Sequence, residues 1–428
     1  MIATAMILLL VLIGISIPVG AALGVLGLLL DPLYSMLPLS RAMGELSWGT
    51  STEFLLVAIP LFIMLGEVLL RAGFAERMYG AMSLWLSWLP GGLMHANIGA
   101  STLFAATSGS SVATAATVGT VSIPQIKRYG YNEPLFLGSI AAGGTLGILI
   151  PPSINLVIYG VLTNSSVPQL YLAGIIPGFT LAALFMVIVL VACVIKPSWG
   201  GKRITASWGE RLASLKHLLP PLGIFLMVVG SIYAGLATPT EAAALGVFGA
   251  LVLSACSGRL SFSMLRDALE GTMRSTAMIM LIVVAAGFLN FVMSATGITT
   301  AVTESITGLG LSPGWMLLVV VIFYVILGCF METLSMMIVT IPVVAPVMTG
   351  LGFDPIWLGI VIVVLVETAL ITPPVGLNLF VVQSLRKSGS MNAVILGAQP
   401  FVIALFSMVA LLAFFPDLAM WLPRVIGG

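Results

Sequence analysis

Long apolar segments follow one another along almost the whole chain and leave little material for a surface facing water. Of the 428 residues, 60% are hydrophobic and 7% are charged, whereas soluble domains carry about 25% charged residues. Lipid must therefore surround most of the protein, and a helix needs about 20 apolar residues to cross it. We predict an all-α polytopic membrane protein with spans near 4–29, 53–71, 76–91, 133–163, 169–195, 217–237, 240–257, 274–296, 355–385 and 391–422.

Two further apolar stretches, 92–127 and 314–350, are interrupted in the middle by small and polar residues. The first interruption is the run 107–111 (Thr-Ser-Gly-Ser-Ser), and the second contains Gly328, Glu332 and Thr333. A polar break at mid-bilayer is unfavourable in a spanning helix, because lipid cannot hydrogen-bond the exposed backbone. Both stretches are therefore predicted to be re-entrant hairpins, each made of two short helices that meet at a tip.

The distribution of basic residues predicts how the chain threads the membrane. The linker 196–216 contains five of the 16 Lys and Arg residues and is placed in the cytoplasm by the positive-inside rule. The resulting threading leaves only Arg71, Arg77 and Arg424 outside and puts both termini in the periplasm. No Lys or Arg precedes Arg41, so the first apolar run is interpreted as a span and not as a signal peptide.

An ordered pattern of motifs occurs twice, in residues 1–195 and 217–428. Ser111 and Thr333 each precede a proline by 13 residues, and a Pro-Pro pair follows in both halves, at 151–152 and 373–374. Because the two halves thread oppositely, we predict inverted repeats, each with one hairpin and one helix broken at Pro-Pro (133–163 and 355–385). The alternative is that Pro and Gly merely kink these helices for packing.

The Pro-Pro breaks are candidate cation sites. Proline removes a backbone donor and frees carbonyl groups, which are costly to bury without a partner. Sodium is a hard cation that prefers such oxygens, together with hydroxyl groups from a facing hairpin tip. We predict two sites, sodium site 1 from Ser108, Ser110, Gly147, Ile150 and Pro152, and sodium site 2 from Gly328, Glu332, Ala369, Thr372 and Pro374. Water or neighbouring hydroxyl groups are the alternative partners.

Helices that restart after each break point amide donors and the positive end of a dipole into the membrane, which favours an anion. Candidate substrate ligands are Ser111, Thr114, Asn155, Thr333 and Asn378, each of which could alternatively be a cap or a packing residue. No Lys or Arg falls at the predicted midplane, and the nearest cation is Arg274, at the inner end of a predicted span. An organic anion would then require bound Na⁺, so we expect symport. Glu332 and Glu367 lie inside predicted membrane segments and could carry protons, so the proton is an alternative coupling ion.

Enzymatic and nucleic-acid functions find little support in the sequence. Only two histidines are present, His95 and His217, and neither a nucleotide-binding loop nor a hydrolase motif occurs. The net charge of +1 provides no basic patch for a nucleic acid. We expect neither an organic cofactor nor a transition metal, and Na⁺ only as a coupling ion. A multi-pass membrane transferase would need a cluster of acid, base or metal-binding residues, and none is apparent.

Five segments of the chain together resemble the large membrane subunit of tripartite ATP-independent periplasmic (TRAP) transporters, of the DctM type. They are the tip 108–111, the run 147–153, the segments 171–178 and 238–243, and the break 372–376. The resemblance implies an elevator mechanism, in which a domain holding the hairpins and broken helices moves against a scaffold, and uptake of an organic anion, such as a C4-dicarboxylate or a sialic acid, with Na⁺.

The same resemblance implies two protein partners and a location. The partners are a small four-helix membrane subunit, expected here as a separate polypeptide, and a periplasmic substrate-binding protein. The location is the inner (cytoplasmic) membrane of a bacterium or archaeon. By position, the two predicted sodium sites correspond to those of the family, and Arg274 resembles a basic residue on the cargo path. The alternative is a stand-alone dicarboxylate- or citrate-type symporter, which would purify without a second hydrophobic chain.

Overall fold

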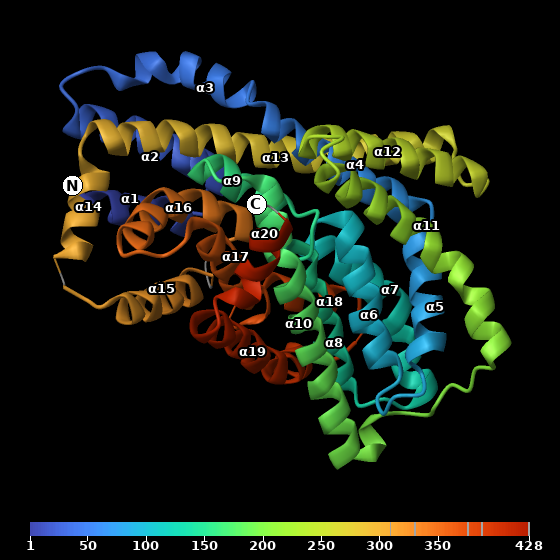
Figure 1. Ribbon diagram of the computed structural model, residues 1–428. Helices are drawn as coiled ribbons and strands as arrows, with labels where there is room; N and C mark the ends of the chain where they lie inside the picture. Colours follow the sequence, from blue (N-terminus) through green and yellow to red (C-terminus); the bar gives the residue numbers. More distant parts are fainter. Residues whose placement is uncertain (309, 329–330, 375, 387, 427–428) are drawn as a thin grey trace.

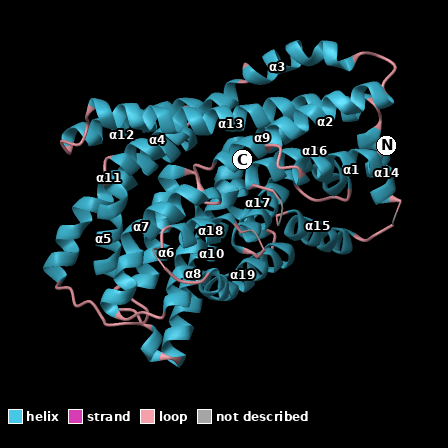
Figure 2. Ribbon diagram, turned by 180° about the vertical axis from the view of Figure 1, so that it is seen from behind, coloured by secondary structure: helices cyan, strands magenta, loops and turns pink. Residues whose placement is uncertain are grey.

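The computed structural model describes residues 1–308, 310–328, 331–374, 376–386 and 388–426, and every element in them is a helix (Figures 1 and 2). The first half contains ten α-helices: α1 (Ile2–Gly14), α2 (Val19–Tyr34), α3 (Met43–Ser51), α4 (Ala58–Arg71), α5 (Phe74–Leu86), α6 (Leu93–Ser108), α7 (Ser111–Tyr129), α8 (Glu133–Thr145), α9 (Ile154–Thr163) and α10 (Val167–Ile195). Short 3₁₀ helices lie at η1 (Leu39–Ala42), η2 (Phe54–Val57), η3 (Leu146–Ile148) and η4 (Pro197–Trp199).

The second half contains ten more α-helices. They are α11 (Trp208–Tyr233), α12 (Pro239–Cys256), α13 (Phe262–Ala295), α14 (Ile298–Thr307), α15 (Pro313–Leu327), α16 (Thr333–Gly350), α17 (Pro355–Ile371), α18 (Leu377–Ser384), α19 (Met391–Phe414) and α20 (Asp417–Ile426). Seven helical segments of the described chain are long and apolar enough to cross a membrane, among them α10, α11, α12, α13 and α19. The all-helical prediction is thus confirmed for the described residues.

The helices divide into an outer layer and an inner group. In the outer layer α2, α3 and α4 lie against the long helix α13, and α12 packs on α4 and α11 (Figure 1). In the inner group α8 packs against α6, α7 and α19, while α17 lies against α16 and α19. Helices α4 and α13 also contact α6 and α16, respectively, so the two groups meet at the hairpins.

Both predicted hairpin segments are interrupted where the sequence is polar. Helix α6 ends at Ser108, Gly109 follows in the left-handed conformation (φ 58°), and α7 begins at Ser111. Helix α15 ends at Leu327 and α16 begins at Thr333. After each hairpin a left-handed glycine (Gly130, Gly352) precedes an Asn or Asp that caps the next helix. The same local capping chemistry therefore starts the helix that follows each hairpin.

Several predicted boundaries were wrong, for local reasons. The predicted span 4–29 is two helices, because Ser16 is left-handed (φ 64°) and Pro18 lies just before α2. The predicted linker 196–216 is partly helical, because a capping box between Ser207 and Glu210 starts α11. The span predicted at 274–296 begins at Phe262, and the one at 391–422 stops before Pro416. Helices α3 and α14 were not predicted.

Helices α8 and α19 cross with their backbones in direct contact. A Cβ atom added to Gly397 would overlap the carbonyl oxygen of Pro134, and one added to Gly138 would overlap the carbonyl oxygen of Gly397. Small residues allow membrane helices to approach in this way and gain close packing. This crossing holds α8, and with it the first Pro-Pro break, against the C-terminal part of the chain.

We predict that Gly397→Leu destabilises the protein by roughly 3 kcal/mol, because overpacking a tight contact forces backbone shifts. The measurement is the fraction of monodisperse protein on size exclusion after heating in detergent. The control is Gly223→Leu, since Gly223 lies on α11 with no atom within 4 Å of an added Cβ. Equal behaviour of the two variants would show that the crossing is not a structural constraint.

Candidate functional site

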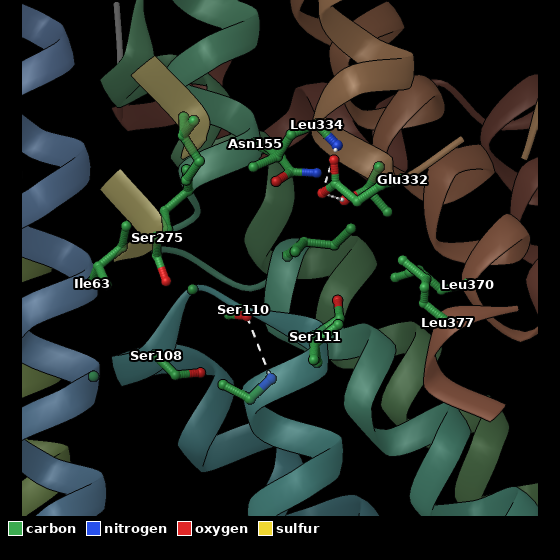
Figure 3. A pocket seen from close by; sticks show the side chains of 18 of the residues that line it. Ile63, Ser108, Ser110, Ser111, Asn155, Ser275, Glu332, Leu334, Leu370 and Leu377 are labelled. Carbon is green, nitrogen blue, oxygen red and sulfur yellow. Dashed lines mark hydrogen bonds between the residues drawn. The ribbon is translucent and has the colours of Figure 1, made fainter. Parts of the chain in front are cut away.

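A cavity of about 290 Å³ lies where both hairpin tips meet α4 and α13 (Figure 3). Its walls come from the two hairpins, from both broken helices and from the outer layer. The lining residues are Ile63, Gly66, Glu67, Leu70, Phe104, Ser108, Gly109, Ser110, Ser111, Val112, Ala113, Ile148, Ile154, Asn155, Ser275, Met278, Ile279, Glu332, Thr333, Leu334, Leu370 and Leu377. Figure 3 shows Asn155 and Glu332 on one side of the cavity and Ser110 and Ser111 on the other.

The first hairpin tip presents hydroxyl groups to this cavity. Ser110 is extended and caps α7, with its Oγ accepting a hydrogen bond from the Ala113 amide at 3.4 Å. Thr114 lies one turn deeper, does not line the cavity, and donates to the Ser110 carbonyl at 2.7 Å. The Oγ of Ser111 is buried and has no hydrogen-bond partner among the described residues. Ser111 lines the cavity without a partner for its hydroxyl group, whereas the hydroxyl group of Ser108 pairs with that of Thr114 at 3.0 Å.

The first Pro-Pro break packs its backbone directly on this tip. An added Cβ at Gly147 would lie 2.7 Å from the Ser110 carbonyl oxygen, and one at Gly109 would lie 3.1 Å from that of Pro152. Ile150 points its side chain toward Gly178 of α10, so any ligand role would fall to its carbonyl. The structure therefore brings Gly147 and Pro152 of the predicted sodium site 1 against the tip, as that site requires.

The second tip is built differently. Glu332 caps α16, and its carboxylate accepts hydrogen bonds from the amides of Leu334 and Ser335, each at 3.1 Å. It also accepts from the hydroxyl groups of Thr333 and Ser335. The Glu332 side chain is thus already committed to its own helix, although it still lines the cavity.

The rest of the predicted sodium site 2 is brought together in part. Gly328 and Ala369 are in direct contact, since a Cβ on Gly328 would overlap that of Ala369. The Thr372 hydroxyl group donates to the Thr368 carbonyl at 2.6 Å, which leaves its lone pairs able to bind a cation. Pro374 is exposed. Residues 329, 330 and 375, which belong to this tip and break, lie outside the described residues.

The predicted substrate ligands separate into two groups. Ser111, Asn155 and Thr333 line the cavity, and the Asn155 amide donates to the Met337 sulfur of α16 at 3.3 Å. Asn378 does not line it, because its side chain is buried and donates to the Ala141 carbonyl of α8 at 3.2 Å. The two asparagines occupy matching positions in the sequence pattern but different environments.

Arg274 is not brought to the cavity. Its side chain is 80% exposed and pairs with Glu270 of the same helix at 3.0 Å. It also lies 12 residues inside α13 and not at the end of a span, because α13 begins at Phe262. The next residue, Ser275, lines the cavity in its place.

Sequence reasoning missed the wall that the outer layer supplies. From α4 it includes Gly66, whose added Cβ would lie 3.0 Å from the Ser108 Cα atom, and Glu67, which pairs with Arg71 at 2.9 Å. From α13 it includes Ser275 and Met278. The signal available in the sequence was Glu67, an acid inside an apolar run. Among the described lining residues the charged ones are Glu67 and Glu332, with no Lys or Arg.

We predict that Gly147→Ala lowers the melting temperature by a few degrees, because the new methyl group must push the tip away from the break, at a cost of about 1–3 kcal/mol. Thermal unfolding of the purified chain measures this. Gly80→Ala on α5 is the matched control, since an added Cβ there meets nothing within 4 Å. A Gly147→Ala protein as stable as the control would mean that break and tip are not in contact.

Comparison with known proteins places this geometry in a family context. Residues 6–418 match the family described as tripartite ATP-independent periplasmic transporter, DctM component. The chain is 36% identical over 388 residues to the C4-dicarboxylate TRAP transporter large permease protein DctM of Pseudomonas aeruginosa, covering 90% of each chain. It is 30% identical to the sialic acid TRAP transporter large permease protein SiaM of Vibrio cholerae, covering 89% of this chain and 88% of that protein.

Two further comparisons bear on cargo and fold. The ectoine TRAP transporter large permease protein TeaC of Halomonas elongata is 29% identical, covering 86% of each chain. Among solved structures, the crystal structure of the YdaH transporter of Alcanivorax borkumensis aligns with a TM-score of 0.64 at 18% identity, covering 95% of this chain and 97% of that one. This last likeness shows the fold alone.

Proposed function

The chain belongs to the DctM family of membrane-embedded large permease components of TRAP transporters, and from that premise we propose that it carries an organic anion together with Na⁺ through the cavity between its hairpin tips. The observation that carries the proposal is that both tips, both breaks and the outer helices α4 and α13 contribute to one cavity. A purely structural membrane protein has no need for four interrupted elements around one space.

The charges around the cavity favour coupling to a cation. Glu67 and Glu332 are the charged residues of the described lining, so a bare anion would meet negative charge there. The N-termini of α7 and α16, at Ser111 and Thr333, each offset this by about 0.3–2 kcal/mol. A Na⁺ about 5 Å from the anion contributes roughly 3 kcal/mol at an effective dielectric constant near 20. Bound Na⁺ is therefore the larger attraction, and cargo affinity should depend on it.

The two predicted sodium sites are the places where this ion would bind. At sodium site 1, Ser108 and Ser110 line the cavity, and the backbone of this tip packs on Gly147 and on the Pro152 carbonyl group. At sodium site 2, Gly328 contacts Ala369, and the Thr372 oxygen keeps lone pairs. Oxygen donors of this kind suit a hard cation. Because the Glu332 carboxylate already accepts four hydrogen bonds, we assign its part in sodium site 2 to the backbone.

The division into layers supports an elevator movement. We assign the outer layer (α2, α3, α4, α12 and α13) to a fixed scaffold, and the hairpins with the broken helices α8–α9 and α17–α18 to a moving transport domain. The predicted inverted repeats, 1–195 and 217–428, place one hairpin and one broken helix from each half in that domain. Gly66 of α4 has no side chain and packs against the backbone of Ser108, so no side chain of α4 interlocks at that point. Such a contact suits sliding.

We further propose that the chain works in the inner membrane with a small membrane subunit and a periplasmic binding protein, and that both termini face the periplasm. The relatives are named for C4-dicarboxylate, sialic acid and ectoine transport, and each cargo carries a carboxylate. A carboxylate-bearing cargo is therefore the class we assign. The competing function is a stand-alone carboxylate symporter, which would need neither partner.

We predict that proteoliposomes containing the chain and its membrane partner accumulate cargo only with an inward Na⁺ gradient and a loaded binding protein. The probes are a radiolabelled C4-dicarboxylate, a sialic acid and ectoine, each supplied with a periplasmic binding protein that binds it. Equal uptake in potassium buffer would refute sodium coupling. Sodium-driven uptake of free cargo without the binding protein would favour the stand-alone symporter.

We predict that Ser111→Ala raises the KM for cargo about fivefold at saturating Na⁺, because a hydrogen bond of about 1 kcal/mol is lost. The matched control is Ser122→Ala on the same helix. Ser122 is equally buried and its hydroxyl group also lacks a partner among the described residues, but it does not line the cavity. If both variants changed the KM alike, or if neither did, Ser111 would not be a cargo ligand.

A further inference from the structure

A second cavity, of about 320 Å³, lies on the other side of the second hairpin, away from the proposed transport site. Helices α15 and α16 form one wall, and α1, α2, α13 and α14 form the other. Figure 1 shows α1, α14, α15 and α16 gathered near the N-terminus. The contacts agree, since α16 lies against α13 and α14 and α1 lies against α14. This apolar cavity has no place in the transport scheme above.

The chemistry of the lining excludes a polar occupant. Eighteen of the nineteen lining residues are Ala, Leu, Ile, Val, Met or Phe, and the other is Thr340. Its hydroxyl group donates to the Met336 carbonyl at 2.7 Å and contacts the Tyr324 hydroxyl group at 2.6 Å, so it is already satisfied. Water gains no partner in such a space, and an empty space would forfeit dispersion contacts along its whole lining. An apolar occupant is therefore expected.

The cavity opens to the surface that faces lipid. At its mouth the side chains of Met6, Val319 and Phe323 are 56%, 46% and 40% exposed. Its floor is made of Leu26, Leu289 and Met348, which are 3%, 3% and 0% exposed. Since these helices are apolar enough to lie in a membrane, the surroundings of the mouth are hydrocarbon.

The lining and the surroundings of the mouth indicate the kind of occupant. A linear hydrocarbon chain matches a lining made almost wholly of Ala, Leu, Ile, Val, Met and Phe side chains. Membrane lipid is the apolar material that lies at the mouth of the cavity. We propose that an acyl chain of a membrane phospholipid occupies this cavity, between the second hairpin and α1, α2, α13 and α14.

Photolabelling in a bilayer tests the proposal directly. The full chain with its membrane partner is placed in nanodiscs of phosphatidylethanolamine and phosphatidylglycerol that contain a phosphatidylethanolamine with a diazirine near the end of one acyl chain. Irradiation followed by peptide mass spectrometry should label the floor residues Met348 and Leu26 as well as the mouth residue Met6. Labelling that is confined to the mouth and no more intense than that of Val191, an exposed residue of α10, would overturn the proposal.

Filling the cavity supplies the second arm. Val320 lines it and is 6% exposed, and we expect Val320→Trp to reduce labelling of Met348 about tenfold. If that variant does not fold, Val319→Trp at the mouth replaces it. Val191→Trp is the control, because Val191 lies outside the cavity and is about as exposed as Val319 (48% and 46%). Undiminished floor labelling in the filled variant would contradict the assignment.

Two other occupants are separated by the same experiment. A free fatty acid that carries the same diazirine should label the floor no better than the phospholipid does. If only the fatty acid labelled the floor, the occupant would be a free fatty acid and the phospholipid proposal would be overturned. Floor labelling that appears only when the partner subunit is left out of the nanodiscs would show that the partner closes the cavity, which also overturns the proposal.

Discussion

The rest of this structure depends on one constraint, which is that helices interrupted inside hydrocarbon expose backbone polar groups. Each interruption leaves amide and carbonyl groups that lipid cannot satisfy. The chain answers with side-chain caps, from Ser110 at α7, Ser153 at α9 and Glu332 at α16. It also packs the interrupted backbones on one another, as Gly147 packs on Ser110. The Ser111 hydroxyl group has no partner among the described residues and lines the cavity between the hairpin tips.

The two halves have the same order of elements but different side chains at the cavity. Both have a hairpin, a glycine turn with an Asn or Asp cap, and a Pro-Pro break. Yet the first tip ends in serine hydroxyl groups and the second in a carboxylate that serves its own helix. Asn155 reaches the cavity, while its counterpart Asn378 is held by the Ala141 carbonyl. The proposed cargo site would therefore be asymmetric, although the backbone pattern that surrounds it recurs.

The second hairpin lies between two cavities, one with polar and apolar lining residues and one lined almost wholly by apolar residues. Residues 332–334 at the start of α16 line the first cavity, and Val339–Met348 further along contribute to the second. With the occupants proposed above, α16 meets water and ions at its start and hydrocarbon further along. In the proposed elevator movement both contacts must stay favourable while the hairpin moves, and fluid occupants allow this better than interlocked side chains.

The sequence by itself determined the membrane environment, the positions of the helix interruptions and the caps around them, because Gly, Pro and Ser/Thr/Asn/Asp act through their immediate neighbours. Tertiary structure decided which face of each helix meets the cavity. One residue turns a helix by about 100°, so Ser275 lines the cavity while Arg274 is exposed. Where every face of a helix is apolar, no periodicity marks the inner one. Only packing against α4, α13 and the opposite hairpin selects it.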